Sequence, residues 1–280
     1  IVQVGLHRRS AELIYRLADF VQGGGIGKVT ASCCFRISNM APGGIGKAQP
    51  SDPPPDLDWD MWLGPRAMRP YQENITPYKF RWWKDYSSQI GNWGVHYFDM
   101  IRWVLGEEAP AAVTALGGKY AVDDDRTIPD TMQACFEFAS GGLMNFSQFE
   151  ASNNPLLAKS GEVELRGTNG TIYARDSGYE VLPERGGQFQ YNSPRMEPLQ
   201  EKASGGNENL TSVHMRNFLD CIKSREKPRC DAEEGHRSTI FAHLANIALE
   251  TRSRIEWDPA AERITNNEAA NALLHYEYRA

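Results

Sequence analysis

The chain has 280 residues, of which 41% are hydrophobic and 24% charged, and its formal net charge is -6. This length is sufficient for a large buried core, and no apolar run approaches the roughly 18 residues that a membrane span needs. The acidic balance and the absence of a Lys/Arg cluster argue against a nucleic-acid partner. We therefore expect neither nucleic acid nor a membrane among its partners.

The five cysteines do not form a pattern typical of disulfides or metal sites. Their number is odd and no two have CxxC spacing, which favours reduced thiols and a cytoplasmic location. No signal peptide is visible, although an export signal upstream of residue 1 is left open.

The first elements are predicted from short apolar patterns. Alternating Val2, Val4 and Leu6 predict a buried strand at the start of the chain. Ser10 is a candidate cap for a helix over about 11–22. The glycines of 23–27 join that helix to a strand over about 28–37. A phosphate-binding loop joins a strand to a helix instead, so we interpret these glycines as a turn.

The middle of the chain changes from loop and helix to strands. A Pro/Gly-rich loop over 41–58 precedes a short helical turn and then a helix over about 89–105. Alternating apolar residues predict the strands that follow, with a tight hairpin turn at 140–142. These strands cover about 111–122, 130–139 and 142–151, and three shorter ones lie within 161–184.

Helices return in the last third of the chain, over about 209–224 and 232–252, with a short one near the C-terminus. Asp231 and Glu234 form a capping box for the second of these. Consecutive hairpin-linked strands predict an open, mostly antiparallel sheet, with helices on one face. The fold class is therefore α+β, preceded by what resembles the last strand of a Rossmann-like domain.

One helix carries the clearest candidate for chemistry. Asn92, His96 and Asp99 have i, i+4, i+7 spacing, which places them on one face of a regular helix. Histidine transfers protons near neutral pH, and a carboxylate can orient it. The alternative is a solvated polar stripe. Gly91 and Gly94 favour a site, because glycine destabilises a helix interior unless something approaches the backbone closely. We expect no metal here, since the face has one histidine and no thiol.

Other polar residues are candidates for binding an oxygen-rich ligand. Arg81, Trp82 and Lys84 lie just upstream of the candidate helix, and together they offer a ring and two cations. His236 lies in the first turn of a capped helix, where backbone N–H groups favour anions, although an exposed first turn explains it equally well. Arg9 belongs to a basic trio that directly follows the predicted first strand.

Several segments together resemble a known family. In chain order they are "VQVGLHRRS", "GGIGKV", "LDWDMWLGP", "FRWWKDYSSQIGNWGVHYFD", "HMRNFLDCIKS" and "EWDPAAERI". They resemble the Gfo/Idh/MocA oxidoreductases, and most closely a bacterial branch with many sugar-catabolic members. Members of the family have a Rossmann domain that binds NAD or NADP. It is followed by a C-terminal α/β domain whose open sheet commonly packs against a partner subunit.

The resemblance implies a role for each candidate. His96 matches the family's acid/base, which exchanges the hydroxyl proton while hydride moves to or from the nicotinamide. Asn92 stands where the family often has aspartate, so the acid/base role rests more heavily on His96. Asp99 is expected to orient groups rather than transfer protons. Arg81, Trp82, Lys84, His236 and Arg9 are expected to bind a sugar, polyol or sugar derivative.

The same resemblance implies that a cofactor-binding part is missing from this chain. Residues 1–8 match the end of the nucleotide-binding domain, and 9–280 match the substrate and oligomerisation domain. We find no dinucleotide-binding motif. The chain is then a fragment of a longer enzyme, the partner of a separate Rossmann chain, or a natural Rossmann-less domain. A domain of the last kind would bind carbohydrates or act as a cofactor-free lyase or epimerase. A homo-oligomer through the open sheet face is also expected.

Overall fold

The computed structural model describes residues 1–159, 161–203 and 209–279, and its centre is one large mixed sheet. The strands lie in the order β11-β10-β2-β3-β4-β1-β6-β7-β8-β9, with β5 paired to β1. All neighbouring strands are antiparallel except β1 and β4, which are parallel. The strands are β1 (Val29–Asn39), β2 (Ala112–Gly118), β3 (Thr131–Glu137), β4 (Leu143–Phe149), β5 (Ala151–Ser152), β6 (Val163–Gly167), β7 (Gly170–Arg175), β8 (Gly178–Pro183), β9 (Leu199–Lys202), β10 (Ile255–Asp258) and β11 (Arg263–Ile264).

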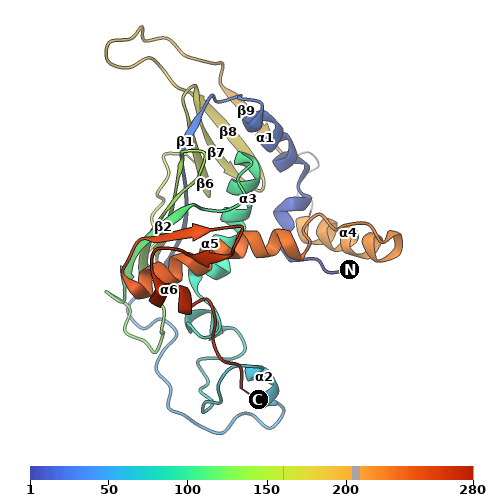
Figure 1. Cartoon of the computed structure of the whole chain (residues 1–280), viewed down its shortest axis with the longest axis vertical. Helices are drawn as coiled ribbons and strands as arrows, with labels where there is room; N and C mark the ends of the chain where they lie inside the picture. Colours follow the sequence, from blue (N-terminus) through green and yellow to red (C-terminus); the bar gives the residue numbers. More distant parts are fainter. Residues whose placement is uncertain (160, 204–208, 280) are drawn as a thin grey trace.

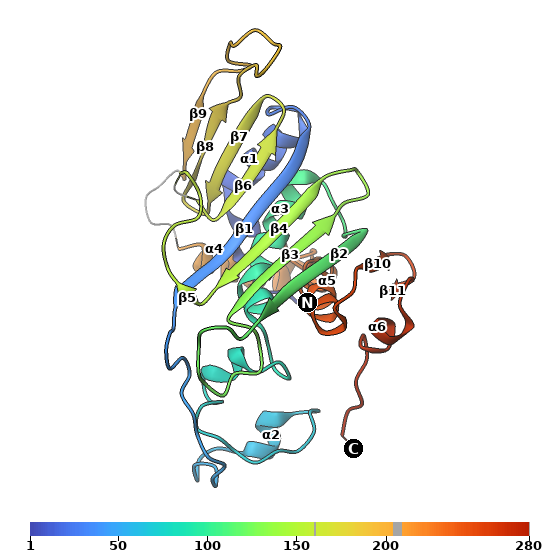
Figure 2. The same cartoon turned by 90° about the vertical axis from the view of Figure 1, so that its left-hand side faces the viewer.

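Helices cover one face of this sheet and leave the other open. In Figure 1 the sheet is seen nearly edge-on, with α1, α3 and α5 on the same side. Figure 2 turns the uncovered face toward the viewer. The predicted fold class, α+β with an open, mostly antiparallel sheet, is confirmed. The helices are α1 (Glu12–Gln22), α2 (Trp59–Leu63), α3 (Val95–Leu105), α4 (Leu210–Ser224), α5 (Ala232–Thr251) and α6 (Glu268–Ala272).

The core lies between the sheet and these helices. Phe98 of α3 packs against Phe136, Phe146 and Phe241, with ring centroids 5.3 to 5.6 Å apart. These rings come from the β3–β4 hairpin and from the helices α3 and α5, so their packing joins segments that are distant in sequence. The hairpin turn between β3 and β4 lies where it was predicted, and Gly141 there has φ +91°, a conformation that favours glycine.

The first six residues do not form the strand that the alternation predicted. They run as irregular extended chain, and Val2 is 63% exposed. The backbone N–H of Val4 donates to the carbonyl of Cys230, not to a strand. A single-turn 3-10 helix, His7–Ser10, follows. An alternating pattern becomes a strand only when a neighbouring strand accepts its hydrogen bonds, and none does so here.

Ser10 is also not the cap of α1. Its hydroxyl is buried and hydrogen-bonded to Nδ1 of His214, at 2.8 Å, while the other ring nitrogen of that histidine donates to the carbonyl of Val4. The N-cap position of α1 is Ala11, without a side-chain cap. The two hydrogen bonds of His214 fasten the start of the chain to α4.

A smaller lobe extends from the edge of the sheet, around α2. Its own apolar core contains Trp59, which stacks on Trp62 at 4.8 Å, and the buried Trp83. Asp58 caps α2 by accepting from the N–H of Met61, as expected for an N-terminal aspartate. The C-terminal segment reaches this lobe in Figure 1, where Arg279 donates to the carbonyls of Asp60 and Gly64.

No helix in the described part of the chain is long and apolar enough to cross a membrane. The five cysteines are free thiols.

Candidate functional site

The candidate helix begins with an irregular turn that alters the predicted face. Residues Ile90–Gly94 form a π-helical turn before α3 starts at Val95. Such turns contain an extra residue and are frequent at functional sites. A Cβ on Gly94 would lie 3.0 Å from the Phe98 ring, and one on Gly91 would lie 3.1 Å from Ser88 Oγ. The glycines therefore allow tight packing, as the sequence suggested, and the turn breaks the regular spacing between Asn92 and the residues after it.

His96 lies in the first turn of α3 and is partly buried. Its ring centroid lies 5.6 Å from that of His7, and its Nδ1 is buried without a hydrogen-bond partner among the described residues. Burial, the Arg8 guanidinium and His7 together lower the pKa of His96 to about 4, and burial has the largest effect. The imidazole is therefore neutral at pH 7, so that one ring nitrogen is able to accept a proton.

The surroundings of His96 concentrate buried polar atoms that lack partners. Ten buried side-chain nitrogen or oxygen atoms are unpartnered among the described residues. Four of these belong to Arg8, Arg36 and His96, which we call the Arg8–His96 cluster: Arg8 lowers the pKa of His96, and both arginines act on the neighbouring Tyr97. Native proteins satisfy most buried polar groups, so a concentration of exceptions needs an explanation. A bound ligand with oxygen atoms is one that fits these donors.

Two elements supply the arginines of this cluster. Arg8 comes from the 3-10 turn, and its guanidinium lies 5.1 Å from the ring of Tyr97. Arg36 comes from β1, and its guanidinium lies 4.3 Å from the ring of Trp93. Both charges lower the pKa of the Tyr97 hydroxyl, although burial, the largest influence, raises it overall. That hydroxyl stays protonated at neutral pH.

Asn92 lies beside Arg81, whose Nε donates to the amide oxygen at 3.3 Å. Arg81 also donates to the carbonyl of Tyr78, and its guanidinium lies 4.0 Å from the centroid of that residue's ring. Two of the predicted site residues, Asn92 and Arg81, are therefore brought together one turn before His96. The amide nitrogen of Asn92 has no hydrogen bond to a described residue and can donate to a hydroxyl.

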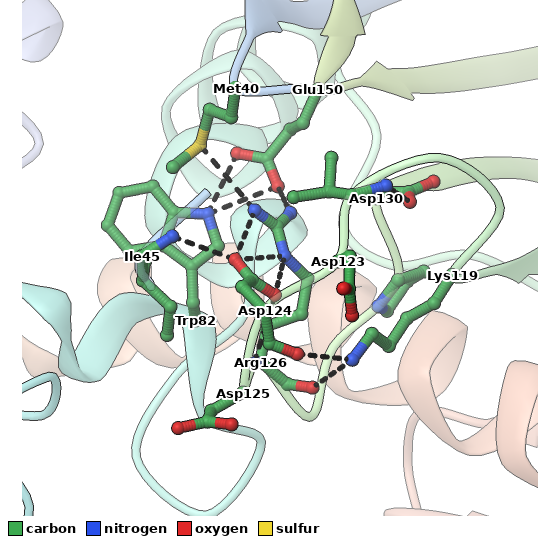
Figure 3. Close-up of polar contacts among 12 residues, drawn as sticks. Met40, Ile45, Trp82, Lys119, Asp123, Asp124, Asp125, Arg126, Asp130 and Glu150 are labelled. Atoms are coloured by element: carbon green, nitrogen blue, oxygen red, sulfur yellow. Dashed lines mark hydrogen bonds and ion pairs between the residues drawn. The ribbon is translucent and has the colours of Figure 1, made fainter. Parts of the chain in front are cut away.

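Trp82 is held by the buried ionic network that Figure 3 shows. Its indole N–H donates to the carboxylate of Glu150, at 3.0 and 3.1 Å. Glu150 in turn pairs with Arg126, which also pairs with Asp124. The Trp82 carbonyl accepts from the N–H of Thr127, in the loop that carries the arginine. The network fixes the orientation of the indole.

Asp99 and Arg9 belong to a second network, in which His96 takes no part. The Asp99 carboxylate is 1% exposed, accepts from Arg9 at 2.9 Å and from Ser238 at 2.7 Å, and lies 3.5 Å from Arg102. Glu234 of α5 pairs with both arginines. The Asp99 carboxylate is therefore bonded to Arg9 and Ser238, and no hydrogen bond joins it to His96, whose Nδ1 has no partner among the described residues. The ion pairs of Asp99 and Arg9 thus link α3, α5 and the 3-10 turn to one another.

Lys84 and His236 lie at the surface, apart from the cluster. Lys84 Nζ is 3.7 Å from a Glu250 carboxylate oxygen. His236 Nε2 is 2.7 Å from Glu262, and both side chains are at least half exposed.

Sequence reasoning missed Arg8 and Arg36. It selected Arg9, the next residue along, because a basic trio gives no indication of which member faces the site. Arg36 had a usable signal: it shares a strand face with the buried Cys34, and an arginine on a buried strand face needs a partner.

The described residues do not fit a dinucleotide. The glycines at 23–27 join α1 to β1, helix to strand, and Gly24 and Gly27 have positive φ, as turn residues do. The N-terminus of a following helix, which binds the pyrophosphate in such folds, is absent at this point. The described residues also contain no group of three or more His, Cys, Asp or Glu that could hold a metal ion.

A family model described as the C-terminal alpha/beta domain of an oxidoreductase family matches residues 29–143 and 189–280. The chain belongs to this family, the Gfo/Idh/MocA oxidoreductases. A search of curated proteins found no match to the chain.

Solved structures with the same fold include three oxidoreductases. An aldose-aldose oxidoreductase from Caulobacter crescentus, complexed with glycerol, matches 91% of this chain at TM-score 0.58 and 14% identity. Levoglucosan dehydrogenase, in complex with NADH and levoglucosan, matches 91% of this chain with a TM-score of 0.60 and 15% identity. The WlbA dehydrogenase from Bordetella pertussis, in complex with NADH and UDP-GlcNAcA, matches 92% of this chain with a TM-score of 0.58 and 14% identity. The chain spans 63%, 66% and 63% of their respective lengths, less than two thirds of each.

The lowered pKa of His96 predicts a pH-dependent stability. Its pKa is near 6.5 when unfolded and about 4 when folded, so the unfolded chain binds more protons between these values. Stability then falls as pH falls through this window, by up to about 3 kcal/mol. His96→Gln removes that loss. We expect urea unfolding to show that the free energy of unfolding of the variant rises relative to that of the parent as the pH is lowered from 7 to 4. If the two free energies instead change with pH in parallel, the pKa assigned to His96 is wrong.

Proposed function

We propose that this chain is the substrate-binding and acid/base part of an NAD(P)-dependent oxidoreductase that acts on a sugar, polyol or sugar derivative. The observation that carries the proposal is the neutral, partly buried imidazole of His96, whose buried Nδ1 is unpartnered among the described residues, within a domain of this family. The relatives' sugar and nicotinamide ligands support the same class.

In this proposal the residues of the chain divide the work on the reacting hydroxyl. His96 accepts the hydroxyl proton during oxidation and returns it during reduction. Asn92, oriented by Arg81, donates its amide N–H to a neighbouring hydroxyl. The Trp82 indole provides an apolar face for the sugar ring. The nicotinamide supplies the hydride acceptor when it is bound.

We propose that the dinucleotide is held by residues from outside this chain, since the described residues offer no cradle for it. Residues 1–8 would then connect to that nucleotide-binding part, and 9–280 would form the substrate domain. We further propose a cytoplasmic, reducing location on account of the free thiols.

The test is nicotinamide reduction by the natural protein that carries this chain, with NAD+ or NADP+ and a panel of sugars and polyols. We expect nicotinamide reduction that depends on the sugar. Sugar consumed without a nicotinamide signal would indicate a lyase or epimerase instead. Binding without turnover would indicate a carbohydrate-binding module.

The open sheet face supports a second copy of the chain as a partner. Leu116, Gln133, Ser147 and Phe35 form a row across β2, β3, β4 and β1 on that face. Leu116 is 69% exposed, and exposed apolar groups on a sheet face favour association. We expect light scattering to show a dimer or larger, and Leu116→Arg to shift it to monomer without loss of helix content. A monomeric parent protein would contradict this.

A further inference from the structure

The Arg8–His96 cluster carries more positive charge than the described residues neutralise. Arg8 pairs with Glu162 through Nη2, while its Nε and Nη1 remain without partners. Arg36 has no carboxylate within ion-pair distance among the described residues, and its Nε is also unpartnered. The two guanidinium groups thus have a single ion-paired carboxylate between them among the described residues, that of Glu162 on Arg8.

The burial of Arg8 makes this arrangement costly unless a ligand completes it. Its side chain is 8% exposed, so its free nitrogens are not satisfied by bulk solvent. A buried donor without a partner lowers stability, and a charged one does so more strongly. Both guanidinium groups lie against aromatic rings, of Tyr97 and Trp93. These contacts hold their planes in place and leave the N–H groups as the binding edge.

The titratable groups near the two arginines neither neutralise their charge nor add a second cation. His96 is neutral at pH 7 and the pKa of His7 is lowered by burial. Tyr97 keeps its proton. The remaining carboxylate nearby, Glu150, is bonded to Arg126 and Trp82. A planar anion with two oxygen atoms would match the free guanidinium nitrogens.

We propose that the substrate of this site carries a carboxylate, as in a uronic or aldonic acid, and that Arg8 and Arg36 bind it beside His96. This inference rests on the proposed function for the location of the substrate, but it concerns binding rather than hydride transfer. A dinucleotide pyrophosphate is the other anion that the same chemistry would accept, and the test separates the two sources.

The experiment measures ligand affinity by calorimetry, without nicotinamide, so that failed binding and failed turnover are distinguished. The ligands are glucuronate, its neutral methyl ester, glucose and ADP-ribose. We expect glucuronate to bind about 10- to 100-fold more tightly than the ester or glucose, from one charge-assisted bidentate contact. Arg8→Gln and Arg36→Gln should each remove most of this preference. Arg263→Gln, an exposed arginine on β11, is the matched control and should retain it.

A variant that is expected to bind glucuronate more tightly is also needed, because misfolding cannot explain a gain of affinity. Glu162→Gln removes the carboxylate that occupies one nitrogen of Arg8, so it should tighten glucuronate binding while leaving glucose unchanged. Equal affinity of the parent for glucuronate and its ester would overturn the proposal, even if sugars are oxidised. Stronger binding of ADP-ribose that competes with glucuronate would also overturn it, by assigning the arginines to the dinucleotide.

Discussion

Arg126→Met is expected to lower the free energy of unfolding by about 3–5 kcal/mol, the usual cost of removing one partner from a buried ion pair. The Arg126 side chain is 0% exposed, and its partners Asp124 and Glu150 are 0% and 1% exposed. Methionine matches part of its volume but leaves two carboxylates without their cation. Asp124 retains only backbone donors, from Ile45 and from residue 126 itself.

The measurement is urea unfolding of the parent and the variant at pH 7. Arg254→Met is the control, because Arg254 pairs with Glu137 and Glu256 at the surface, where such pairs contribute about 1 kcal/mol or less. Equal losses for the two variants would show that the buried network does not stabilise the fold.

The size of the Arg126→Met loss should depend on pH. Burial already raises the pKa of Glu150, and Arg126 opposes that rise. Without the arginine, the pKa of the folded carboxyl rises further above that of the unfolded chain. The folded variant then binds more protons as the pH falls, so its deficit relative to the parent should narrow in acid.

His96→Gln is expected to lower the turnover number of the proposed dehydrogenase by about 10²- to 10⁴-fold, the range for loss of a general acid/base. Glutamine retains hydrogen-bonding atoms but cannot accept the hydroxyl proton. His7→Gln is the matched control, because its ring packs beside His96 but has no acid/base role in the proposal. We expect its effect to be within threefold.

The pH profile tests the same assignment independently. With a pKa of about 4 for His96, sugar oxidation at limiting substrate should be flat above about pH 5 and fall in more acid solution. A falling limb centred near pH 6.5, or His96→Gln retaining near-normal turnover, would move the acid/base role to another group.

Much of the fold was predictable because its signals are local. Met132, Ala134 and Phe136 alternate along β3 and face the core, as the period of two required. Asp231 caps α5 by accepting from the N–H of Glu234, as the capping pattern indicated. The two partners of each such signal lie within a few residues of each other, so the printed sequence contains both.

Long-range pairing was not predictable in the same way. The parallel pairing of β1 with β4 joins residues more than 100 positions apart, and no feature of either strand identifies the other. β9, β10 and β11 were missed because they are short and pair at the edges of the sheet. The strand expected before residue 7 was wrong for the converse reason, since its alternation had no partner strand.

The sequence by itself determined the α+β class, the covered face of the sheet and His96 as the leading candidate, because periodicity and side-chain chemistry are properties of neighbouring residues. Only the tertiary structure decided that Arg8 rather than Arg9 lies beside His96, and that Asp99 pairs with buried arginines. It also decided that Arg36 has no carboxylate within ion-pair distance among the described residues. Those outcomes depend on which charges meet when distant segments pack, and burial then sets both the pKa of the histidine and the cost of every unpaired donor.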